Sequence, residues 1–344
     1  MSNITENRQV LPSGRPAREW NLPAPYGTKT LLVLIVIGVL LTVSGRNSEI
    51  DKMFGMIGEA VGYSVGISES SQVVRGLGRV GSSMWPPQIS EVTQVSRIEN
   101  FDPDDLPLFA RIETQEVTAS RVDPVTLERT ETVTTREVLV DPIGYLRHVL
   151  WKMLETVEIA IWATIVAILI SIPLAYFSAA NYTPNRFLYN GARAVVSFFR
   201  AIPELISAMF LVLAFGFGPI AGILALGFHS AGFLGKFYAE DIENADKGPQ
   251  EALRSIGASK VKTLRFAVLP QVLPQYVAYN MYILDRNVRM ATVVGIVGAG
   301  GIGQELKGRY DMFDYGHVAT ILILIFLAVF TLDQIASRIR AKLI

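Results

Sequence analysis

Residues near the C-terminal end of the chain, from Gly298 to Gly303, fit the pattern G-x-G-x-x-G. Between a strand and a helix, this pattern lets the backbone approach a dinucleotide and hold its phosphates. Here the glycines lie between two apolar segments, and no βαβ repeat surrounds them. Small residues let backbones come close together within a membrane, and broken backbone is tolerated where it lines a cavity. We therefore predict that Gly298, Gly300, Gly301 and Gly303 line a pore or form helix contacts and hold no cofactor.

Two pairs of ionisable residues could bind an anion or join helices. Arg286 and Arg289 are spaced to share one helix face, where guanidinium groups could hold the oxygens of a phosphoryl group. Arg200 and Glu204 flank Pro203 at the inner edge of an apolar segment, where ionisable residues either reach the interface or have a function. Because they are four residues apart, we expect Arg200 and Glu204 to form an ion pair along one helix.

Other reactive side chains are few. The chain has no cysteine, which excludes disulfides, thiolate catalysis and cysteine-ligated metals. His148, His229 and His317 lie far apart without metal-ligand spacing, so we expect packed or interfacial side chains and no metal site. Glu155 and Glu158 are expected to be solvated acids at the start of a helix, where the helix dipole favours them.

The composition is that of a membrane protein. Half of the 344 residues are hydrophobic and 18% are charged, with a mean hydropathy of +0.36, whereas soluble domains carry about 25% charged residues. The formal net charge is zero, so nothing indicates nucleic-acid binding. Apolar segments predict an all-α polytopic fold with about six transmembrane helices. The predicted spans are residues 30–44, 157–180, two within 205–234 (the first beginning within 190–204), 266–284 and 317–332.

Lysines and arginines in the short loops predict the orientation. The N-terminal tail, residues 1–29, and the C-terminus are placed in the cytoplasm, and residues 45–145 on the opposite side. Residues 146–344 form a transmembrane domain with a cytoplasmic loop at 239–262. Cations that fall on the outer side or within the membrane are expected to pair with nearby acids. The cations are Arg286, Arg289, Lys307 and Arg309, and the acids are Asp285, Glu305, Asp311 and Asp314.

The outer segment contains a stretch with the character of a small β-sheet. Between about 91 and 141, β-branched and polar residues alternate around Asp123–Pro124, which predicts a half-buried hairpin or small sheet. Valine and threonine are too abundant there for a disordered linker.

The segment from Gly248 to Tyr276 indicates a docking function. We predict a short helix at 250–256, a break at Gly257 with the positive φ of a helix C-cap, a second basic turn, and then a span. On the cytoplasmic face, such a pair of short helices would expose Glu251 to a soluble partner.

This segment resembles the EAA motif of bacterial ABC importer permeases. The expected coupling-loop residues are Glu251, Ala252, Gly257, Ala258, Leu269 and Pro270, of which all but Ala258 stand at motif positions. Leu253 stands where alanine is common, and Ala267 where a branched apolar residue is usual. The resemblance implies that the loop inserts into a groove on a separate ATPase subunit and transmits its closure to the membrane helices.

Further stretches are similar to phosphonate-type permeases, and methionine-type permeases share the looser outline. These stretches are "MWPPQIS" (84–90), "FRAIPELI" (199–206), "GFHSAGFLGKFYAEDIE" (227–243) and "NVRMATVVGIVGAGGIGQEL" (287–306). The insert at about 91–141 departs from that pattern. The candidate translocation-path residues, chosen by residue type and position, are Arg200, Pro203, Glu204, Arg286, Arg289, Gly298, Gly300, Gly301 and Gly303.

The expected function is that of the permease subunit of an ATP-driven importer. The chain contains no G-x-x-x-x-G-K-[ST], so ATP and Mg²⁺ are expected on the partner ATPase. The resemblance implies a homodimer or paired permease with two ATPase subunits and an extracytoplasmic solute-binding protein, in the bacterial inner membrane. The cargo would be a phosphonate or a related phosphorus oxyanion, moved by alternating access.

Three alternatives remain open. One is a permease for another small solute, such as methionine. Another is an ion-coupled secondary transporter, which would show inverted repeats and acids deep in its spans. The last is a membrane-anchored signalling or assembly protein that acts through the outer segment.

Overall fold

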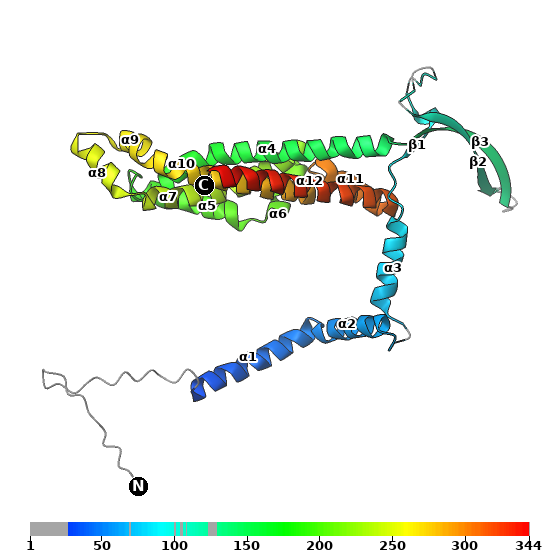
Figure 1. Ribbon diagram of the computed structural model, residues 1–344, viewed down its shortest axis with the longest axis horizontal. Coiled ribbons are helices and arrows are strands. Elements are labelled where there is room, and N and C mark those ends of the chain that lie inside the picture. Colours follow the sequence, from blue (N-terminus) through cyan, green and yellow to red (C-terminus); the bar gives the residue numbers. More distant parts are fainter. Residues whose placement is uncertain are drawn as a thin grey trace, which may run out of the picture. The chain divides into compact units, whose positions relative to one another are not determined.

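The computed structural model describes residues 27–68, 70–99, 101–103, 106–107, 109–122 and 129–343. The chain divides into two compact units, Met1–Arg79 and Val80–Ile344, and helices dominate both (Figure 1). Most of the predicted N-terminal tail and the predicted turn at Asp123–Pro124 lie outside the described residues.

The first unit consists of helices with exposed apolar side chains. Helix α1 (Thr28–Asn47) includes the predicted span 30–44, and none of its residues is buried. Helix α2 (Ile50–Ser64) follows, and helix α3 (Gln72–Met84) crosses the boundary between the units. The sequence did not predict α2 and α3, which lie within residues 45–145, where we expected only a small sheet.

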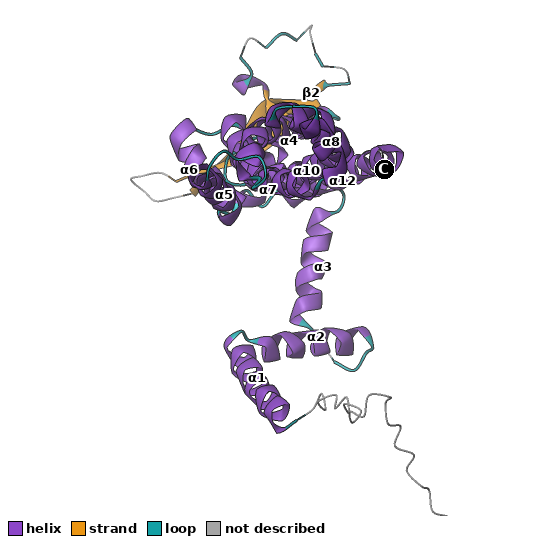
Figure 2. Cartoon of the chain, turned by 90° about the vertical axis from the view of Figure 1, so that its left-hand side faces the viewer, coloured by secondary structure: helices purple, strands orange, loops and turns teal. Residues whose placement is uncertain are grey.

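The second unit is a helical bundle built around α4 (Gly144–Ser178), α7 (Pro219–Asn244) and α10 (Leu269–Gly295). Figure 2 shows these helices almost end on, side by side with α12 (Tyr315–Leu343). Small residues allow the close approach of α4 and α7. Ala160 and Ala163 on α4 are fully buried, and a Cβ at Gly227 on α7 would lie 3.0 Å from Cγ1 of Val166. Close contact between small residues is how helices associate within lipid.

The remaining span is broken. Helix α5 (Arg186–Ala201) and helix α6 (Glu204–Phe215) meet at an angle of 92°. We expected this span to begin within 190–204, and the two helices together are apolar enough for one span, but they do not form a straight helix. Pro203 has no N–H to donate and disfavours a helical conformation at the residue before it, so the helix ends at Ala201.

The helical membrane architecture is confirmed. Among the described residues, four helices are long and apolar enough to cross a bilayer, namely α1, α4, α7 and α12, and the bent pair α5–α6 would be a fifth span. Helix α10 has the length of a span but carries Asp285, Arg286 and Arg289. A total of six spans, which includes α10, remains a prediction.

A small antiparallel sheet precedes the bundle. Its strands are β1 (Glu91–Gln94), β2 (Arg111–Val122) and β3 (Arg129–Asp141), in the order β1-β3-β2. A short 3₁₀ turn, Val95–Arg97, follows β1. The register pairs Arg111 with Val140 at one end and Val122 with Arg129 at the other. The predicted small sheet is thus present in this region.

Backbone hydrogen bonds attach the segment before the sheet to the bundle. The N–H of Gln88 donates to the carbonyl of Gly316 (3.0 Å), and the N–H of Leu146 donates to the carbonyl of Ile89 (3.1 Å). The hydroxyl of Thr320 donates to the carbonyl of Gln88 (2.6 Å). These contacts fix the sheet at the end of the bundle where α4 and α12 begin (Figure 1). At the opposite end lie two short helices, α8 (Lys247–Ser255) and α9 (Lys260–Thr263).

Candidate functional site

The predicted pair of short helices is present, and each end of α8 has a cap. The carboxylate of Asp246 accepts a hydrogen bond from the N–H of Gly248 (3.1 Å) at its start. At its end, Gly257 has a φ of +84° and the N–H of Ala258 donates to the carbonyl of Leu253 (3.0 Å). The positive φ predicted for Gly257 is therefore confirmed. A π-helical turn, Leu264–Val268, then leads from α9 into α10.

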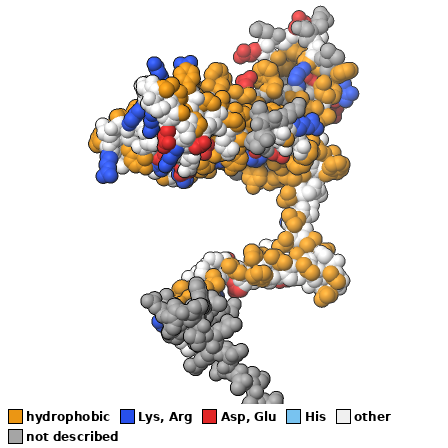
Figure 3. Space-filling model, turned by 60° about the vertical axis from the view of Figure 1, so that its left-hand side comes forward, with side chains coloured by type: hydrophobic (Ala, Val, Ile, Leu, Met, Phe, Trp, Pro, Cys, Tyr) orange, Lys and Arg blue, Asp and Glu red, His pale blue; other side chains and the backbone are white. Residues whose placement is uncertain are grey.

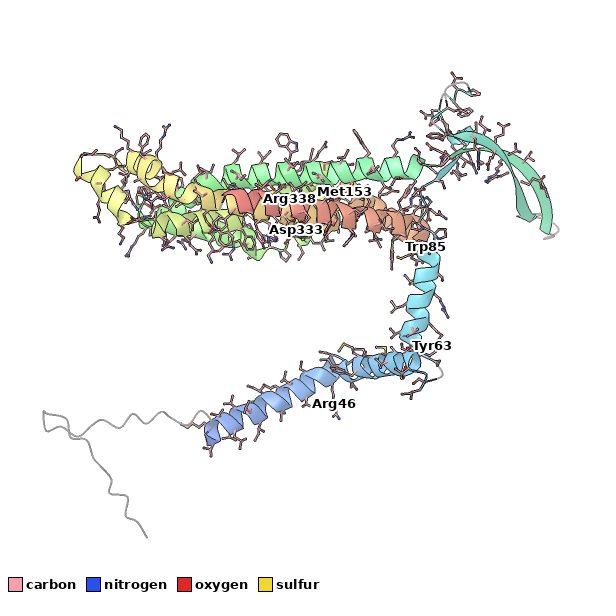
Figure 4. All side chains as sticks on the ribbon, viewed as in Figure 1. Arg46, Tyr63, Trp85, Met153, Asp333 and Arg338 are labelled. Atoms are coloured by element: carbon pink, nitrogen blue, oxygen red, sulfur yellow. The ribbon has the colours of Figure 1, made fainter. Side chains whose placement is uncertain are left out.

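The outer face of α8 and α9 combines exposed apolar and charged side chains, and we call it the coupling surface. Glu251 and Ala252 are exposed, and so are the apolar side chains of Ile256 (79%) and Val261 (62%). Exposed basic residues surround them, and Figure 3 shows lysine and arginine side chains gathered over this end. These residues are Lys247, Arg254, Lys260, Lys262 and Arg265. Exposed apolar groups with a polar rim are typical of a docking surface.

The other residues predicted for the coupling loop lie nearby in the chain. Ala258 is half-buried, whereas Leu269 and Pro270 are exposed on the first turn of α10. The predicted cytoplasmic loop, 239–262, is not a loop throughout, because α7 continues to Asn244 and Ala239 is fully buried. The coupling surface therefore begins only after Ala245.

A buried glutamine attaches α8 to the bundle. Gln250 is 5% exposed, and its amide nitrogen donates to the carbonyls of Ala245 (3.1 Å) and Asp246 (3.0 Å). Its amide oxygen accepts from the hydroxyl of Tyr182 (2.9 Å), which lies in the turn between α4 and α5. Burial raises the pKa of Tyr182, so the hydroxyl keeps the proton that it donates. Gln250 was not among the predicted residues, although it precedes Glu251 and points about 100° away from it around the helix.

Two further contacts hold the same end of the bundle together. Arg193 on α5 binds the carboxylate of Glu243 on α7 (3.0 and 3.2 Å) and donates from Nε to the carbonyl of Ser178 (3.0 Å). The same carboxylate accepts from the N–H of Ala180 (2.7 Å). The ends of α4 and α7 and the middle of α5 therefore form one connected group next to α8.

We expect Gln250→Ala to loosen α8 without unfolding the bundle. The substitution leaves the Tyr182 hydroxyl and two carbonyls without their partner, and each unsatisfied buried group costs about 1–3 kcal/mol. Amide hydrogen exchange of residues 247–263 should become at least about tenfold faster, since tenfold corresponds to about 1.4 kcal/mol. Ser255→Ala, at an exposed position of the same helix, is the matched control. Equal exchange in Gln250→Ala and the control would show that Gln250 does not hold α8.

The predicted pairing of Arg200 with Glu204 is wrong. The bend at Pro203 separates the two residues onto different helices, so the i, i+4 geometry is lost. The carboxylate of Glu204 instead accepts from Nη2 of Arg286 on α10 (2.8 Å), and the guanidinium of Arg200 lies over the ring of Phe233 (4.9 Å).

The glycine-rich stretch forms the turn between α10 and α11 (Gly301–Asp311) and makes close backbone contacts. The N–H of Gly218 donates to the carbonyl of Gly298 (3.0 Å), and a Cβ at Gly300 would lie 3.0 Å from the nitrogen of Pro219. A Cβ at Gly303 would lie 2.0 Å from the carbonyl oxygen of Thr292. These glycines therefore allow close contact between helices. The described strands pair only antiparallel, whereas a dinucleotide-binding βαβ unit needs a parallel pair.

We expected Glu155 to be a solvated acid at the start of a helix, and that expectation is wrong. Helix α4 begins at Gly144, and the carboxylate of Glu155 accepts from the N–H of Gly301 (3.0 Å), while the Thr156 hydroxyl accepts from the N–H of Ile302 (2.8 Å). These two side chains cap the start of α11. Glu158 is exposed on α4, well inside the helix.

Most of the expected pairs between cations and acids are present. Arg289 binds Asp285 (2.6 Å), Arg309 binds Glu305 (2.9 Å) and Asp314 (3.2 Å), and Lys307 binds Asp311. Burial alone would raise the pKa of Asp314, but a hydrogen bond with His317 and the charge of Arg309 outweigh it and hold that pKa below its usual range. Arg286 is the exception, because it binds Glu204.

The histidines each contact neighbouring polar groups. His317 lies 2.6 Å from the Asp314 carboxylate, His148 lies 3.4 Å from Glu305, and His229 is buried beside Glu204. Within the part of the chain that the structure describes, no group of three or more histidine and acidic residues could hold a metal ion.

Comparison with known proteins places this geometry in a family. Residues 171–343 match the family described as binding-protein-dependent transport system inner membrane component. A relative from Stutzerimonas stutzeri that is named as a phosphite transport system permease protein, HtxE, is 60% identical over 261 residues, which are 76% of this chain and 100% of the relative. The phosphite transport system permease protein PtxC of the same organism is 41% identical and covers 57% of this chain and 71% of its own length.

A solved structure shows the same fold. The inward-facing MetNI methionine ABC transporter matches with a TM-score of 0.51 at 23% identity, covering 57% of this chain and 96% of the matched chain.

Proposed function

This chain belongs to the family of binding-protein-dependent transport system inner membrane components, and we propose that it is the permease subunit of an ATP-driven importer for a phosphorus oxyanion. The observation that carries the proposal is its 60% identity to the whole of a protein named for phosphite transport. The exposed coupling surface supports the same role, because it leaves Glu251 and the surrounding basic residues free for a partner.

The contacts next to the coupling surface suggest how force would enter the bundle. Gln250 joins α8 to Tyr182 in the turn after α4, and the side chain of Gln271 on α10 accepts from the N–H of Asp246 (3.0 Å). Movement of α8 would therefore be passed to α4 and α10 together. In this mechanism, ATP and Mg²⁺ bind to two separate ATPase subunits, and their closure moves α8 and switches the access of the central path.

The assembly would contain two permease chains, two ATPase subunits and an extracytoplasmic solute-binding protein. In the orientation that the basic loop residues favour, both chain ends and the coupling surface face the cytoplasm, and the sheet faces the other side. Phosphite is the proposed cargo because the relatives HtxE and PtxC are named for phosphite transport, and phosphonates are included because of the sequence resemblance to phosphonate-type permeases. The likeness to the methionine transporter supports the fold alone, since only 23% of aligned residues are identical.

Co-purification and reconstitution test this function. The tagged chain, purified from its native cells, should carry an ATPase subunit with it in stoichiometric yield. Proteoliposomes that contain both, together with the binding protein, should import phosphite or an alkylphosphonate when ATP is present and should not import methionine. Absence of the ATPase from the purified chain, or equal import without ATP, would contradict the proposal and favour an ion-coupled transporter.

A further inference from the structure

A cluster of ionisable side chains lies at the break between α5 and α6. We call it the ion-pair cluster. It consists of Arg200, Glu204, His229 and Arg286, together with Phe233, whose ring lies against both guanidinium groups. The side chains of Glu204, His229 and Arg286 are only 13%, 9% and 22% exposed, and their helices α6, α7 and α10 contact one another. Ionisable groups inside a membrane bundle are costly to bury, and they mark the path of a substrate or ion in many transporters.

The hydrogen bonds fix the charge of His229. Its Nδ1 lies 3.0 Å from the carbonyl of Ile202, which can only accept, and its Nε2 lies 2.8 Å from Nη2 of Arg286, which can only donate. Nε2 also lies 3.4 Å from the Glu204 carboxylate, but its contact with the Arg286 donor is shorter, so we assign the hydrogen to Nδ1 and treat the imidazole as neutral. With two arginines and one glutamate, the cluster has one excess positive charge.

Arg200 holds that excess charge, and it has a donor to spare. The guanidinium groups of Arg200 and Arg286 each lie 4.9 Å from the ring centre of Phe233. The Nε of Arg200 is buried, and no described residue accepts its hydrogen. Gly232 permits this placement, since a Cβ there would lie 2.8 Å from Cγ of Arg200. A buried donor without an acceptor costs about 1–3 kcal/mol, so a group that accepted from it would stabilise the site.

The carboxylate of Glu204 lies directly at the break in the span. Glu204 is the first residue of α6 and follows Ile202 and Pro203, so its position depends on the angle between the two short helices. Its carboxylate oxygen accepts from Arg286 as the oxygen of a phosphoryl group would. A phosphoryl group has three such oxygens, one more than the carboxylate that it would replace.

We propose that Arg200 and Arg286 form a binding site for a tetrahedral oxyanion, in which Glu204 occupies the place of the anion until the substrate displaces it. This inference rests on the proposed function only for the identity of the anion. The carboxylate keeps Arg286 neutralised in the empty site, and the arriving oxyanion takes both guanidinium groups. The alternative is a purely structural ion pair between Glu204 and Arg286, in which Arg200 would have no part.

Direct binding to the permease alone separates the two readings. Phosphite is titrated into the chain in lipid nanodiscs, without ATPase or binding protein, and its Kd is measured by calorimetry. Glu204→Gln removes the competing carboxylate and should lower the Kd for phosphite at least about tenfold, which is about 1.4 kcal/mol. Adding Arg200→Gln to that variant should raise the Kd at least tenfold again. Methionine should bind none of these proteins.

Lys236→Gln is the matched control, because Lys236 is a cation on α7 that pairs with Glu240 outside the cluster. It should leave the Kd unchanged. An unaltered Kd in Glu204→Gln, or equal binding after Arg200→Gln is added, would overturn the proposal. If Glu204→Gln does not fold, Arg200→Gln in the otherwise unchanged chain is decisive, since a structural pair predicts no effect on phosphite affinity.

The outcome is independent of the test of function. If the complex does not import phosphorus oxyanions but the binding changes above are observed, the binding site exists and the transported solute is a different one. If import succeeds but the binding changes are absent, the proposed site is wrong and the proposed function is retained.

Discussion

Gly303→Ala is expected to prevent α10 and α11 from packing together, so that little folded protein is recovered. The new Cβ would lie 2.0 Å from the carbonyl oxygen of Thr292 and 2.9 Å from Cα of Gly295. Both neighbours are backbone atoms, which a change of side-chain rotamer cannot move. Overpacking of this kind typically costs about 1–3 kcal/mol, and we expect at least the upper end. The yield and melting temperature of the purified chain measure the effect.

Gly308→Ala provides the comparison on the same helix. A Cβ at Gly308 would meet nothing within 4 Å. Alanine also favours a helix over glycine by up to about 1 kcal/mol, so this variant should be as stable as the original chain or more so. Equal melting temperatures for Gly303→Ala and Gly308→Ala would show that α10 and α11 are not in such close contact.

Glu251→Lys is expected to reduce both substrate-stimulated ATP hydrolysis and import while the chain stays folded. Glu251 is exposed on α8, so a longer basic side chain fits without disturbing the helix. If a partner receives this carboxylate, reversing its charge replaces attraction with repulsion, and losing one member of a paired interfacial charge costs about 2–5 kcal/mol. Substrate-stimulated ATP hydrolysis and import by the reconstituted complex should fall at least about tenfold.

Two further variants identify the cause of that loss. Glu251→Gln removes only the charge and should show a smaller decrease. Ser259→Lys adds a lysine at an exposed position between α8 and α9 and should have little effect. Full coupling in Glu251→Lys would show that the carboxylate takes no part in docking.

The sequence predicted those features that depend on neighbours along the chain. The break at Gly257 follows from the conformational freedom of glycine, and the two short helices follow from the residues around it. The helical membrane architecture follows from apolar segments long enough to cross a bilayer, and the small sheet from the alternation of β-branched residues.

Contacts between distant residues could not be predicted in the same way. Arg200 and Glu204 have the spacing of a helical pair, but Pro203 ends the helix, and Glu204 finds Arg286 on α10 instead. Glu155 caps α11 at Gly301, a contact that exists only because α4 and α11 pack together. Gln250 looked like an ordinary neighbour of Glu251 because nothing local reveals that Tyr182 donates to it.

The length of α4 determines where the sheet lies relative to lipid. Its 35 residues span about 52 Å at 1.5 Å per residue, and even a tilt of about 40° leaves about 40 Å along the bilayer normal, against about 30 Å of hydrocarbon. Trp151, which is 70% exposed, suits the headgroup layer on the side where the helix starts. The turns before Trp151 then extend into water and carry β3 with them. The open edges of β1 and β2 are therefore hydrated, as unpaired strand edges must be, because hydrocarbon offers them no hydrogen bonds.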